Sequence, residues 1–578
     1  MKKRLFTLSV LVLAATGVLA CTNFIVGKKA SKDGSVICSY SADSYGMFQG
    51  LVHYPAAKHP KGTMLKVYEW DTNKYLGEIA EAEETYNVIG NINEWQVTIG
   101  ETTFGGREEM VDTTGIIDYG SLIYIALQRS KTAREAIDVM TTLVEQYGYC
   151  SEGETFTICD PNEAWIMEMM GSPIPNPSPK GKVAKSAQGR TVWVAMRIPD
   201  DMICGHANQS RITTFMPAKK EEKGKETVLW SKNVVSYARL MGWYDGKDQD
   251  FSYNAAYAAP DFSGRRICDA RVWSFFNRYA DGMDRYIAWA EGHDKDAEVL
   301  PLWVKPNRLL SVADVEAAMR DHFEGTPFSI GAPSNLPHMG EASSVKQEGT
   351  DIGGGIWEMP YRPTPLYFEV DGKKYFNERP VSTQQAGFVY VSQMRSWLPR
   401  EVGGCFWFAN DDGNMVPFTP VYCCATESPR PYNTPGADDL TFSMDNAFWV
   451  QNWVSNMVYP RYSMMFPSLE QVRDSLDNSY FRLQKEVEDK ALGLDRDARV
   501  SYLTAYTAEK AEQMLARWKQ LATYLIVKYN DMTSKPEDEQ GRFLRTPNGL
   551  GATVKRPGYP QRFGRELIRQ TGSRYELE

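Results

Sequence analysis

The 578-residue sequence has few residues that bind metals and lacks a recognisable cofactor motif. Its six histidines are scattered, and neither HExxH nor CxxC occurs, so the common zinc sites have no support. Glycine-rich loops of the P-loop and dinucleotide-binding types are also missing. The sequence therefore predicts an activity that needs neither a metal nor a cofactor.

A run of basic residues is lacking as well, although 64 residues are Lys or Arg. The formal net charge is −9, whereas a nucleic-acid-binding chain normally carries a basic patch or stripe. No segment after residue 20 is as long and apolar as a membrane-spanning helix, which needs about 20 residues. We therefore expect no nucleic-acid partner and no integral membrane segment in the mature protein.

Cysteine is sparse, with nine residues in the chain. An odd number leaves at least one thiol unpaired, and the spacings do not make a disulfide framework. Cys423 and Cys424 are adjacent, and we expect them to be small buried side chains rather than a bridge.

The N-terminus has the layout of a secretory signal peptide. Met1 to Arg4 form a short basic head, and residues 5–20 are apolar or small, without an acidic residue. The run ends at Ala20, a small residue of the kind that a signal peptidase reads. We therefore expect residues 1–20 to be removed, and the mature protein to begin at Cys21 in the periplasm or outside the cell.

A cysteine at the first position of a chain carries its own base. The free α-amino group has a pKa near 7.7–8.0, so a good fraction is neutral at physiological pH and can accept the thiol proton. The Cys21 thiolate would then attack an amide carbonyl and form a thioester, while preorganised donors stabilise the oxyanion. This chemistry requires no histidine.

The same position has a second interpretation. Val18-Leu19-Ala20-Cys21 partly matches a lipobox, in which the cysteine is acylated and tethers the protein to a membrane. Leu19 stands where a smaller residue is usual. Acylation of the amine and a thioether on the sulfur would abolish the catalysis, so the two interpretations exclude each other. Position alone does not decide between them.

The first two strands are predicted to form a hairpin that brings an acid close to Cys21. Residues 21–27 and 35–40 are strand-like, and Asp33-Gly34 is a strong turn signal. If these two residues form the turn, Cys21 faces Gly46. Asp43 then lies a few residues away at the same end of the hairpin.

Strands recur at both ends of the first 425 residues, with helices in separate stretches, which favours one large α+β unit. The predicted strands include residues 96–103, 154–159, 164–169, 191–198 and parts of 364–410. The predicted helices are one capped by Thr132, followed by 311–323, 468–492 and 508–529. We therefore predict an α+β catalytic unit over residues 21–440 and a helical extension with a tail over residues 441–578.

Four blocks of the sequence resemble peptidase family C69, a family of dipeptidases. They are residues 21–35, 93–108, 206–212 (His-Ala-Asn-Gln-Ser-Arg-Ile) and 270–273 (Ala-Arg-Val-Trp). That family belongs to the N-terminal nucleophile hydrolases and is similar to penicillin V acylases and bile salt hydrolases. The resemblance covers roughly residues 21–430 and implies a four-layer αββα sandwich.

The resemblance also implies a role for each matching residue. Cys21 matches the nucleophile and N-terminal base, and Asp43 matches an acid that binds near the amine. Asn208 matches the side-chain donor of the oxyanion hole, with a backbone N–H near Thr102 or Thr103 as the second donor. Arg271 matches an arginine that supports the nucleophile electrostatically.

One position departs from this pattern. Relatives often have an arginine three residues before the acid, and here that residue is Tyr40. A neutral phenol cannot lower the pKa of the Cys21 thiol as an arginine can, so the pH profile or the placement of the substrate is expected to differ.

Taken singly, the supporting residues have ordinary explanations. Asp43 could be a turn residue, Asn208 a helix cap, and Arg271 part of a surface salt bridge. His206 is expected to be a structural hydrogen-bonding residue rather than a base. Glu101 could bind a substrate ammonium group, but a solvated carboxylate at a strand end is the favoured interpretation.

Three functions are compatible with the sequence. The leading hypothesis is a dipeptidase that acts on dipeptides or short peptides with a free α-amine. The second is a non-peptide amide hydrolase, which needs an apolar slot for an acyl chain where a dipeptidase needs a carboxylate. The third is a surface lipoprotein that binds peptides or glycans without catalysis. A homo-oligomer is compatible with all three.

Overall fold

The computed structural model describes residues 21–577 except residues 45, 176–178, 180–183, 220, 330–359, 362–365, 559 and 560. The predicted signal peptide, residues 1–20, lies outside the described residues. Among the helices that are described, none has both the length and the apolar character needed to cross a membrane.

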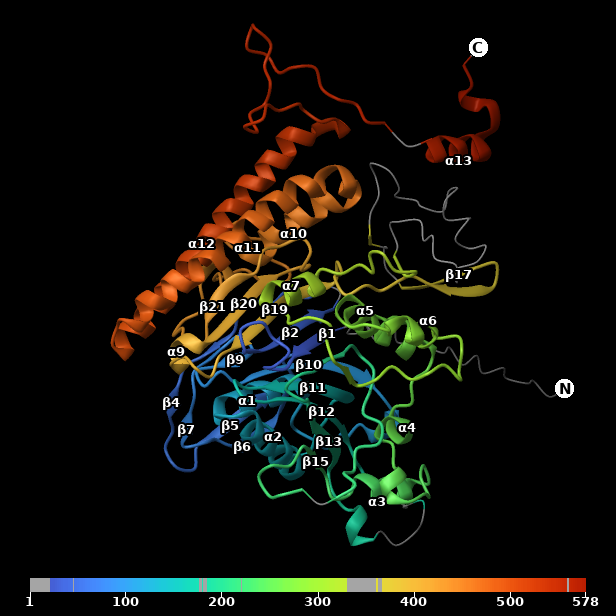
Figure 1. The fold of residues 1–578 in the computed structure, drawn as a ribbon, viewed down its shortest axis with the longest axis vertical. Helices are drawn as coiled ribbons and strands as arrows, with labels where there is room; N and C mark the ends of the chain where they lie inside the picture. The colour runs from blue at the N-terminus through green and yellow to red at the C-terminus, as the bar shows by residue number, and fades with distance from the viewer. Residues whose placement is uncertain are drawn as a thin grey trace, which may run out of the picture.

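Two large antiparallel sheets form the centre of the fold (Figure 1). The seven-stranded sheet has the order β16 (Trp303–Val304), β14 (Ile203–His206), β1 (Thr22–Val26), β2 (Val36–Asp43), β19 (Ala386–Met394), β20 (Gly404–Asn410) and β21 (Thr419–Tyr422). The eight-stranded sheet has the order β15 (Val228–Trp230), β13 (Thr191–Arg197), β12 (Ala164–Gly171), β11 (Gly153–Cys159), β10 (Thr98–Gly105), β9 (Ile92–Asn93), β8 (Val88–Ile89) and β3 (His53–Tyr54).

Short ribbons extend from this centre. They pair β4 (Ala57–Lys58) with β7 (Glu84–Thr85), β5 (Met64–Tyr68) with β6 (Tyr75–Ala80), and β17 (Tyr367–Val370) with β18 (Lys373–Phe376).

The two large sheets face each other, and helices pack on their outer sides (Figure 1). Polar side chains connect the facing strands: the Tyr390 hydroxyl donates to the Ile99 carbonyl at 3.2 Å, and the Thr98 and Ser392 hydroxyls are 3.2 Å apart. Helices α1 (Tyr119–Arg129) and α2 (Ala133–Tyr147) cover the eight-stranded sheet, and α5 (Ala270–Tyr279) and α7 (Val312–Met319) cover the seven-stranded one. The predicted α+β class is confirmed.

Other helices lie at the ends of the sheets and in the connections. They are α3 (Val234–Met241), α4 (Tyr253–Tyr257), α6 (Ile287–Glu291) and α9 (Arg400–Gly403). Helix α13 (Gln561–Thr571) lies in the C-terminal tail.

Local sequence signals explain several of these elements. The Thr132 side chain accepts a hydrogen bond from the Glu135 N–H, so the predicted cap of α2 is confirmed. The hairpin of β11 and β12 turns around Asp160, as predicted, because its carboxylate accepts the N–H groups of Asn162 and Glu163. The same carboxylate accepts the Ala133 N–H and so joins this turn to the start of α2.

The predicted register of the first hairpin is wrong. Thr22 pairs with Ser41, so the position opposite Cys21 is residue 42 rather than Gly46. The connection between β1 and β2 is longer than a two-residue turn, since β1 ends at Val26 and β2 begins at residue 36.

Contacts outside the hairpin explain this longer connection. The N–H groups of Lys29 and Ala30 donate to the Asp200 carbonyl, which draws the chain away from pairing with β2. The Asp33 carboxylate accepts from the Ser35 N–H at 3.1 Å, so the turn at Asp33 and Gly34 lies inside a loop. Asp43 nevertheless stays at the Cys21 end of the hairpin, because it forms the last residue of β2.

Three long helices pack beside the last strands of the seven-stranded sheet, as Figure 1 shows. They are α10 (Ala447–Val458), α11 (Tyr462–Leu492) and α12 (Arg496–Tyr529). The helices at 468–492 and 508–529 are confirmed, but both begin earlier than predicted. Pro467 lies inside α11, near its start, where the missing N–H disturbs few helical bonds. The division of the chain at residue 440 stays a prediction.

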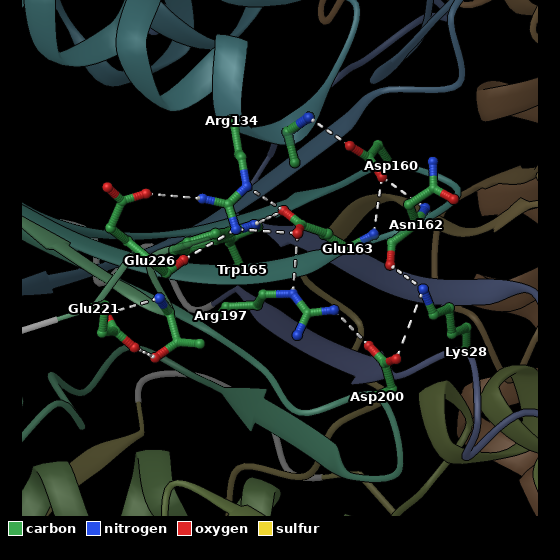
Figure 2. Close-up of polar contacts among 12 residues, drawn as sticks. Lys28, Arg134, Asp160, Asn162, Glu163, Trp165, Arg197, Asp200, Glu221 and Glu226 are labelled. Atoms are coloured by element: carbon green, nitrogen blue, oxygen red, sulfur yellow. Dashed lines mark hydrogen bonds and ion pairs between the residues drawn. The ribbon is translucent and has the colours of Figure 1, made fainter. Parts of the chain in front are cut away.

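An ionic network joins the eight-stranded sheet to the connections that follow β1 and precede β14 (Figure 2). Glu163 accepts hydrogen bonds from Arg134 at 2.8 Å and from the Trp165 indole at 3.0 Å, and its carboxylate lies 3.2 Å from Arg197. Arg197 continues the network to Asp200 at 2.7 Å. The hairpin of β11 and β12 is thereby tied to the connection that precedes β14.

Replacing Glu163 with Gln should lower the free energy of unfolding by about 1 kcal/mol, because two ion pairs that are partly exposed are lost. The Gln side chain still accepts from Trp165, so the fold itself is kept. Urea unfolding measures the change, which should shrink at high salt because exposed charges are screened. An unchanged unfolding curve, or a loss of catalytic activity, would contradict the purely structural role of this network.

Candidate active site

Cys21 lies directly before β1 and is 3% exposed. Its side chain contacts one residue from each large sheet: Sγ lies 3.8 Å from the Tyr40 hydroxyl and 3.5 Å from Glu101 Oε1. These groups line a small cavity of about 20 Å³, together with the aromatic side chains Trp70, Tyr119, Tyr124 and Phe388. The thiol therefore lies in a small and largely apolar space that contains a carboxyl group.

The surroundings hold the Cys21 thiol in its neutral form. Burial raises the pKa of the thiol well above its usual value, and the charges of Glu101 and Asp43 raise it further. A hydrogen bond from the backbone of Asp43 acts in the opposite direction. The thiol therefore needs a base and a compensating positive charge before it can react as a thiolate.

Arg271 connects Cys21 to a second segment of the site. It is fully buried on α5, directly after a π-helical turn over Gly264–Asp269, an irregularity that is frequent at functional sites. Its guanidinium donates to the Cys21 carbonyl at 2.7 Å and to Asn208 Oδ1 at 3.0 Å. Burial lowers the pKa of Arg271 to about 10, so the group is charged at neutral pH. The surface salt bridge considered for Arg271 is excluded.

Asn208 lies in the loop after β14 with a φ of 61°, a left-handed conformation that asparagine adopts more readily than most residues. Because Arg271 can only donate, its contact identifies Oδ1 and directs Nδ2 to the other side. Nδ2 donates to the Thr103 carbonyl at 2.8 Å, beside an irregularity in the pairing of β10. The structure thus brings Asn208, Arg271 and Thr103 together, and no helix begins at Asn208.

Asp43 lies at the end of β2, beside Cys21, where its placement was predicted. It is fully buried, and its Oδ2 accepts from Arg379 and from the Ser41 hydroxyl. Oδ1 has no hydrogen-bond partner among the described residues. Burial raises the pKa of Asp43, while the charge of Arg379 opposes this shift.

Glu101 is buried, so the expectation of a solvated carboxylate is wrong. The residue is 2% exposed because β10 lies inside the eight-stranded sheet and is covered by α1. Oε1 accepts from the Tyr40 hydroxyl and from the Cys21 thiol. Tyr40, which stands where relatives often have arginine, therefore contacts both the thiol and the carboxyl group.

His206 has the structural role that the sequence predicts. It is fully buried, with Thr102 Oγ1 2.8 Å from Nδ1 and Thr157 Oγ1 2.7 Å from Nε2. Burial lowers the pKa of His206 well below its usual value, so the ring is neutral. The imidazole holds β14 against the eight-stranded sheet.

The structure shows no candidate metal site among the residues that it describes. There, no three side chains of His, Cys, Asp or Glu gather in a way that could hold a metal ion. All nine cysteines are described, and none forms a disulfide bond. Cys423 and Cys424 are buried, as predicted.

Sequence reasoning missed two charged residues near the site. Arg379 lies 336 positions from Asp43, and nothing in the local sequence links the two. Glu154, on β11, is fully buried beside Glu101 on the neighbouring strand. Its strand was predicted, but β-strand alternation alone does not show that an acidic side chain on the helix-covered face of the sheet lacks solvent.

Comparisons with known proteins agree with one another. The sequence profile of peptidase family C69 matches residues 20–51 and 48–475. A "Probable dipeptidase" from Salmonella dublin is 24% identical over 440 residues, which cover 73% of this chain and 84% of the relative. A "Probable dipeptidase" from Latilactobacillus sakei is 22% identical over 517 residues (85% and 92%), and "Dipeptidase A" from Lactobacillus helveticus is 21% identical over 458 residues (76% and 81%).

Proposed function

We propose that this chain, which belongs to peptidase family C69 and is a cysteine-type peptidase, hydrolyses dipeptides with Cys21 as its nucleophile. The relatives named as dipeptidases support the substrate class. The observation that carries the proposal is the contact of one guanidinium, that of Arg271, with both the Cys21 carbonyl and the Asn208 amide. This contact fixes the residue that carries the thiol and the residue that carries the side-chain N–H donor relative to each other, as acyl transfer requires.

The base in this proposal is the α-amino group of Cys21, which exists only after residues 1–20 are removed. A neutral amine takes the thiol proton and becomes an ammonium group. Oδ1 of Asp43 has no hydrogen-bond partner among the residues that the structure describes, which supports a role in holding that ammonium, because it is a buried acceptor at the same end of the hairpin. The charge of the ammonium also offsets the Asp43 carboxylate, one of the groups that disfavour the thiolate.

The chemical steps then balance without a cofactor. The thiolate adds to the peptide carbonyl, and the oxyanion accepts hydrogen bonds from Asn208 Nδ2 and from a backbone N–H near Thr103. When the C–N bond breaks, the leaving amine takes the proton from the Cys21 ammonium, and a thioester remains. Water attacks the thioester with the amine again as base, which releases the acyl product and restores the thiol.

The fold supports the same assignment. Two facing antiparallel sheets with helices on their outer sides are what the four-layer αββα sandwich of the N-terminal nucleophile hydrolases requires. In this proposal residues 21–440 form that catalytic unit. Helices α10 to α12 belong to an extension that packs on its last strands.

A hydrolase of N-acyl amides is the second candidate, because aromatic side chains make up much of the cavity wall. The buried carboxyl group of Glu101 favours a cationic substrate group over an acyl chain. A lipid-anchored binding protein is disfavoured, since a diacylglycerol thioether does not fit a sulfur that is buried between Tyr40 and Glu101. We therefore propose an exported enzyme with an unmodified Cys21.

The test uses the protein secreted by cells that make the full chain. Its intact mass should equal that of unmodified residues 21–578, and it should hydrolyse dipeptides at least about 100-fold faster than the matching N-acetyl amino acid amides, as a lost charged contact predicts. Hydrolysis of N-acyl substrates alone would support the acylase instead. A diacylglycerol-modified Cys21 without any hydrolysis would overturn the enzyme proposal.

A further inference from the structure

Two carboxyl groups lie together beside the Cys21 thiol. Glu101 on β10 and Glu154 on the adjacent β11 are 2% and 0% exposed. Glu154 pairs in register with Thr103, two residues after Glu101, so the two acids are diagonal neighbours on one face of the sheet. One oxygen of each carboxyl group is occupied: Tyr40 and Cys21 donate to Glu101 Oε1, and Thr103 Oγ1 donates to Glu154 Oε2 at 3.0 Å.

The other oxygen of each group has no donor outside the pair. Glu101 Oε2 and Glu154 Oε1 are buried and receive no hydrogen bond from any other described residue. Burial raises the pKa of both groups, and a hydrogen bond between them stabilises the state in which they share one proton. In that state the pair carries one negative charge.

No cation of the described chain neutralises this pair. Neither acid forms a salt bridge with a lysine, arginine or histidine among the described residues, whereas the buried Asp43 has Arg379 and the buried Asp269 has Arg211. A buried charge is expensive unless it is paired. The pair therefore has the electrostatics of a site that is completed by a cationic ligand. The cavity of about 20 Å³ in front of Glu101 has room for a group the size of one water molecule, as an ammonium group is.

We propose that the Glu101–Glu154 pair binds the α-ammonium group of the substrate, and that this ammonium makes Cys21 reactive by neutralising the charge beside its sulfur. The inference rests on the proposed dipeptidase function and identifies the residues that make the enzyme specific for substrates with a free α-amine. Glu101 is the residue that contacts the ammonium, and Glu154 is a positioning residue that keeps one proton between the two carboxyl groups.

The geometry of an α-amino acid fits this arrangement. Its ammonium nitrogen and its carbonyl carbon are both bonded to Cα, about 2.5 Å apart. A carbonyl carbon placed for attack by Cys21 Sγ therefore has its ammonium group within reach of a carboxyl group that lies 3.5 Å from the same sulfur. Only the first residue of a peptide carries this group, so the site selects a free N-terminus and releases one residue at a time.

The same contact explains how a thiol can work next to an acid. In the empty site, the negative charge of Glu101 disfavours the Cys21 thiolate. A bound ammonium cancels that charge only when a substrate with a free amine is in place. An N-acylated substrate brings no positive charge and leaves the thiol suppressed.

Kinetics on three variants tests the specificity. For a dipeptide, Glu101→Gln should raise KM by about 100-fold with a much smaller change in kcat, since a buried charged contact is lost. Glu154→Leu should move the rise of KM at acidic pH to a higher pH, because Glu101 loses the hydrogen bond with Glu154 that lowers its pKa. Glu152→Gln, the same change as in Glu101→Gln on an exposed residue two positions from Glu154, is the matched control. A wild-type KM in Glu101→Gln would overturn the proposal.

Alkylation of Cys21 by iodoacetamide tests, independently of hydrolysis, whether a bound ammonium group makes the thiol more reactive. L-Alaninol, which has an α-ammonium but no carbonyl, should speed alkylation of the wild-type thiol by about tenfold and leave Glu101→Gln unchanged, as cancellation of one neighbouring charge predicts. Without alaninol, Glu101→Gln should react faster than wild type. No effect of alaninol on the wild-type protein would overturn the proposal, whatever the folding of the variant.

The outcomes also separate this inference from the proposed function. If wild type hydrolyses no dipeptide but alaninol still speeds alkylation, the dipeptidase proposal fails and the ammonium site stands. If wild type hydrolyses dipeptides and Glu101→Gln does so with the same KM, the function stands and the ammonium site fails.

Discussion

Cys21→Ala should lower kcat on every dipeptide that the wild-type enzyme hydrolyses, by at least about 10⁴-fold. The alanine side chain cannot form the thioester, and none of the other eight cysteines contacts the cavity that Cys21 lines. Cys21→Ser should lose nearly all activity as well, because a hydroxyl is a far weaker nucleophile than a thiol with the same base. Initial rates on a dipeptide panel measure both losses.

A second version of this experiment tests the role of the amine while the thiol is kept. A chain that starts at Ala20 keeps the Cys21 thiol but turns its amine into a peptide N–H, so the proposed base is gone. Its activity should fall by at least about 10²-fold, the lower end of what general base catalysis contributes. Cys150→Ser, a change of a partly exposed thiol outside the site, should leave activity intact. Activity retained in Cys21→Ala would refute the mechanism.

Asn208→Gly should lower kcat by about 10²–10³-fold, the effect of removing one donor from an oxyanion hole. Glycine is the right replacement because residue 208 has a φ of 61°, which alanine adopts only with strain. KM should change little, since the oxyanion exists only after attack. Steady-state kinetics on one dipeptide gives both constants.

The control for this variant is Asn73→Gly. Asn73 also has a positive φ, of 57°, but it is exposed in the turn between β5 and β6. It therefore reports the effect of the backbone change alone and should keep the wild-type kcat. A loss in Asn208→Gly that appears only in KM would assign Asn208 to substrate binding rather than to the oxyanion.

Local signals in the sequence predicted the elements that local chemistry determines. The Thr132 cap, the Asp160 hairpin and the long C-terminal helices were found because turn residues and helical periodicity act over a few positions. The nearness of Asp43 to Cys21 was predicted despite a wrong register, because adjacent antiparallel strands keep one end in common.

Contacts between distant segments could not be predicted in this way. The register of the first hairpin depends on the Asp200 carbonyl, which lies far along the chain and captures the connection after β1. The pairing of Asp43 with Arg379 and the burial of Glu101 arise from tertiary packing. Spacing within a motif carries no information about such partners, so the charges around Cys21 became visible only in the folded protein.

The position of β1 has a consequence for the thermal inactivation of the enzyme. Chain ends are usually the least ordered parts of a protein. Here β1 lies between β14 and β2, and Arg271 donates to the carbonyl of Cys21, which becomes the chain end if residues 1–20 are removed as proposed. Fraying of that end requires the central strands to separate, so inactivation by heat and global unfolding should share one timescale. The fraction of activity that remains after heating should therefore equal the fraction of molecules that are still folded.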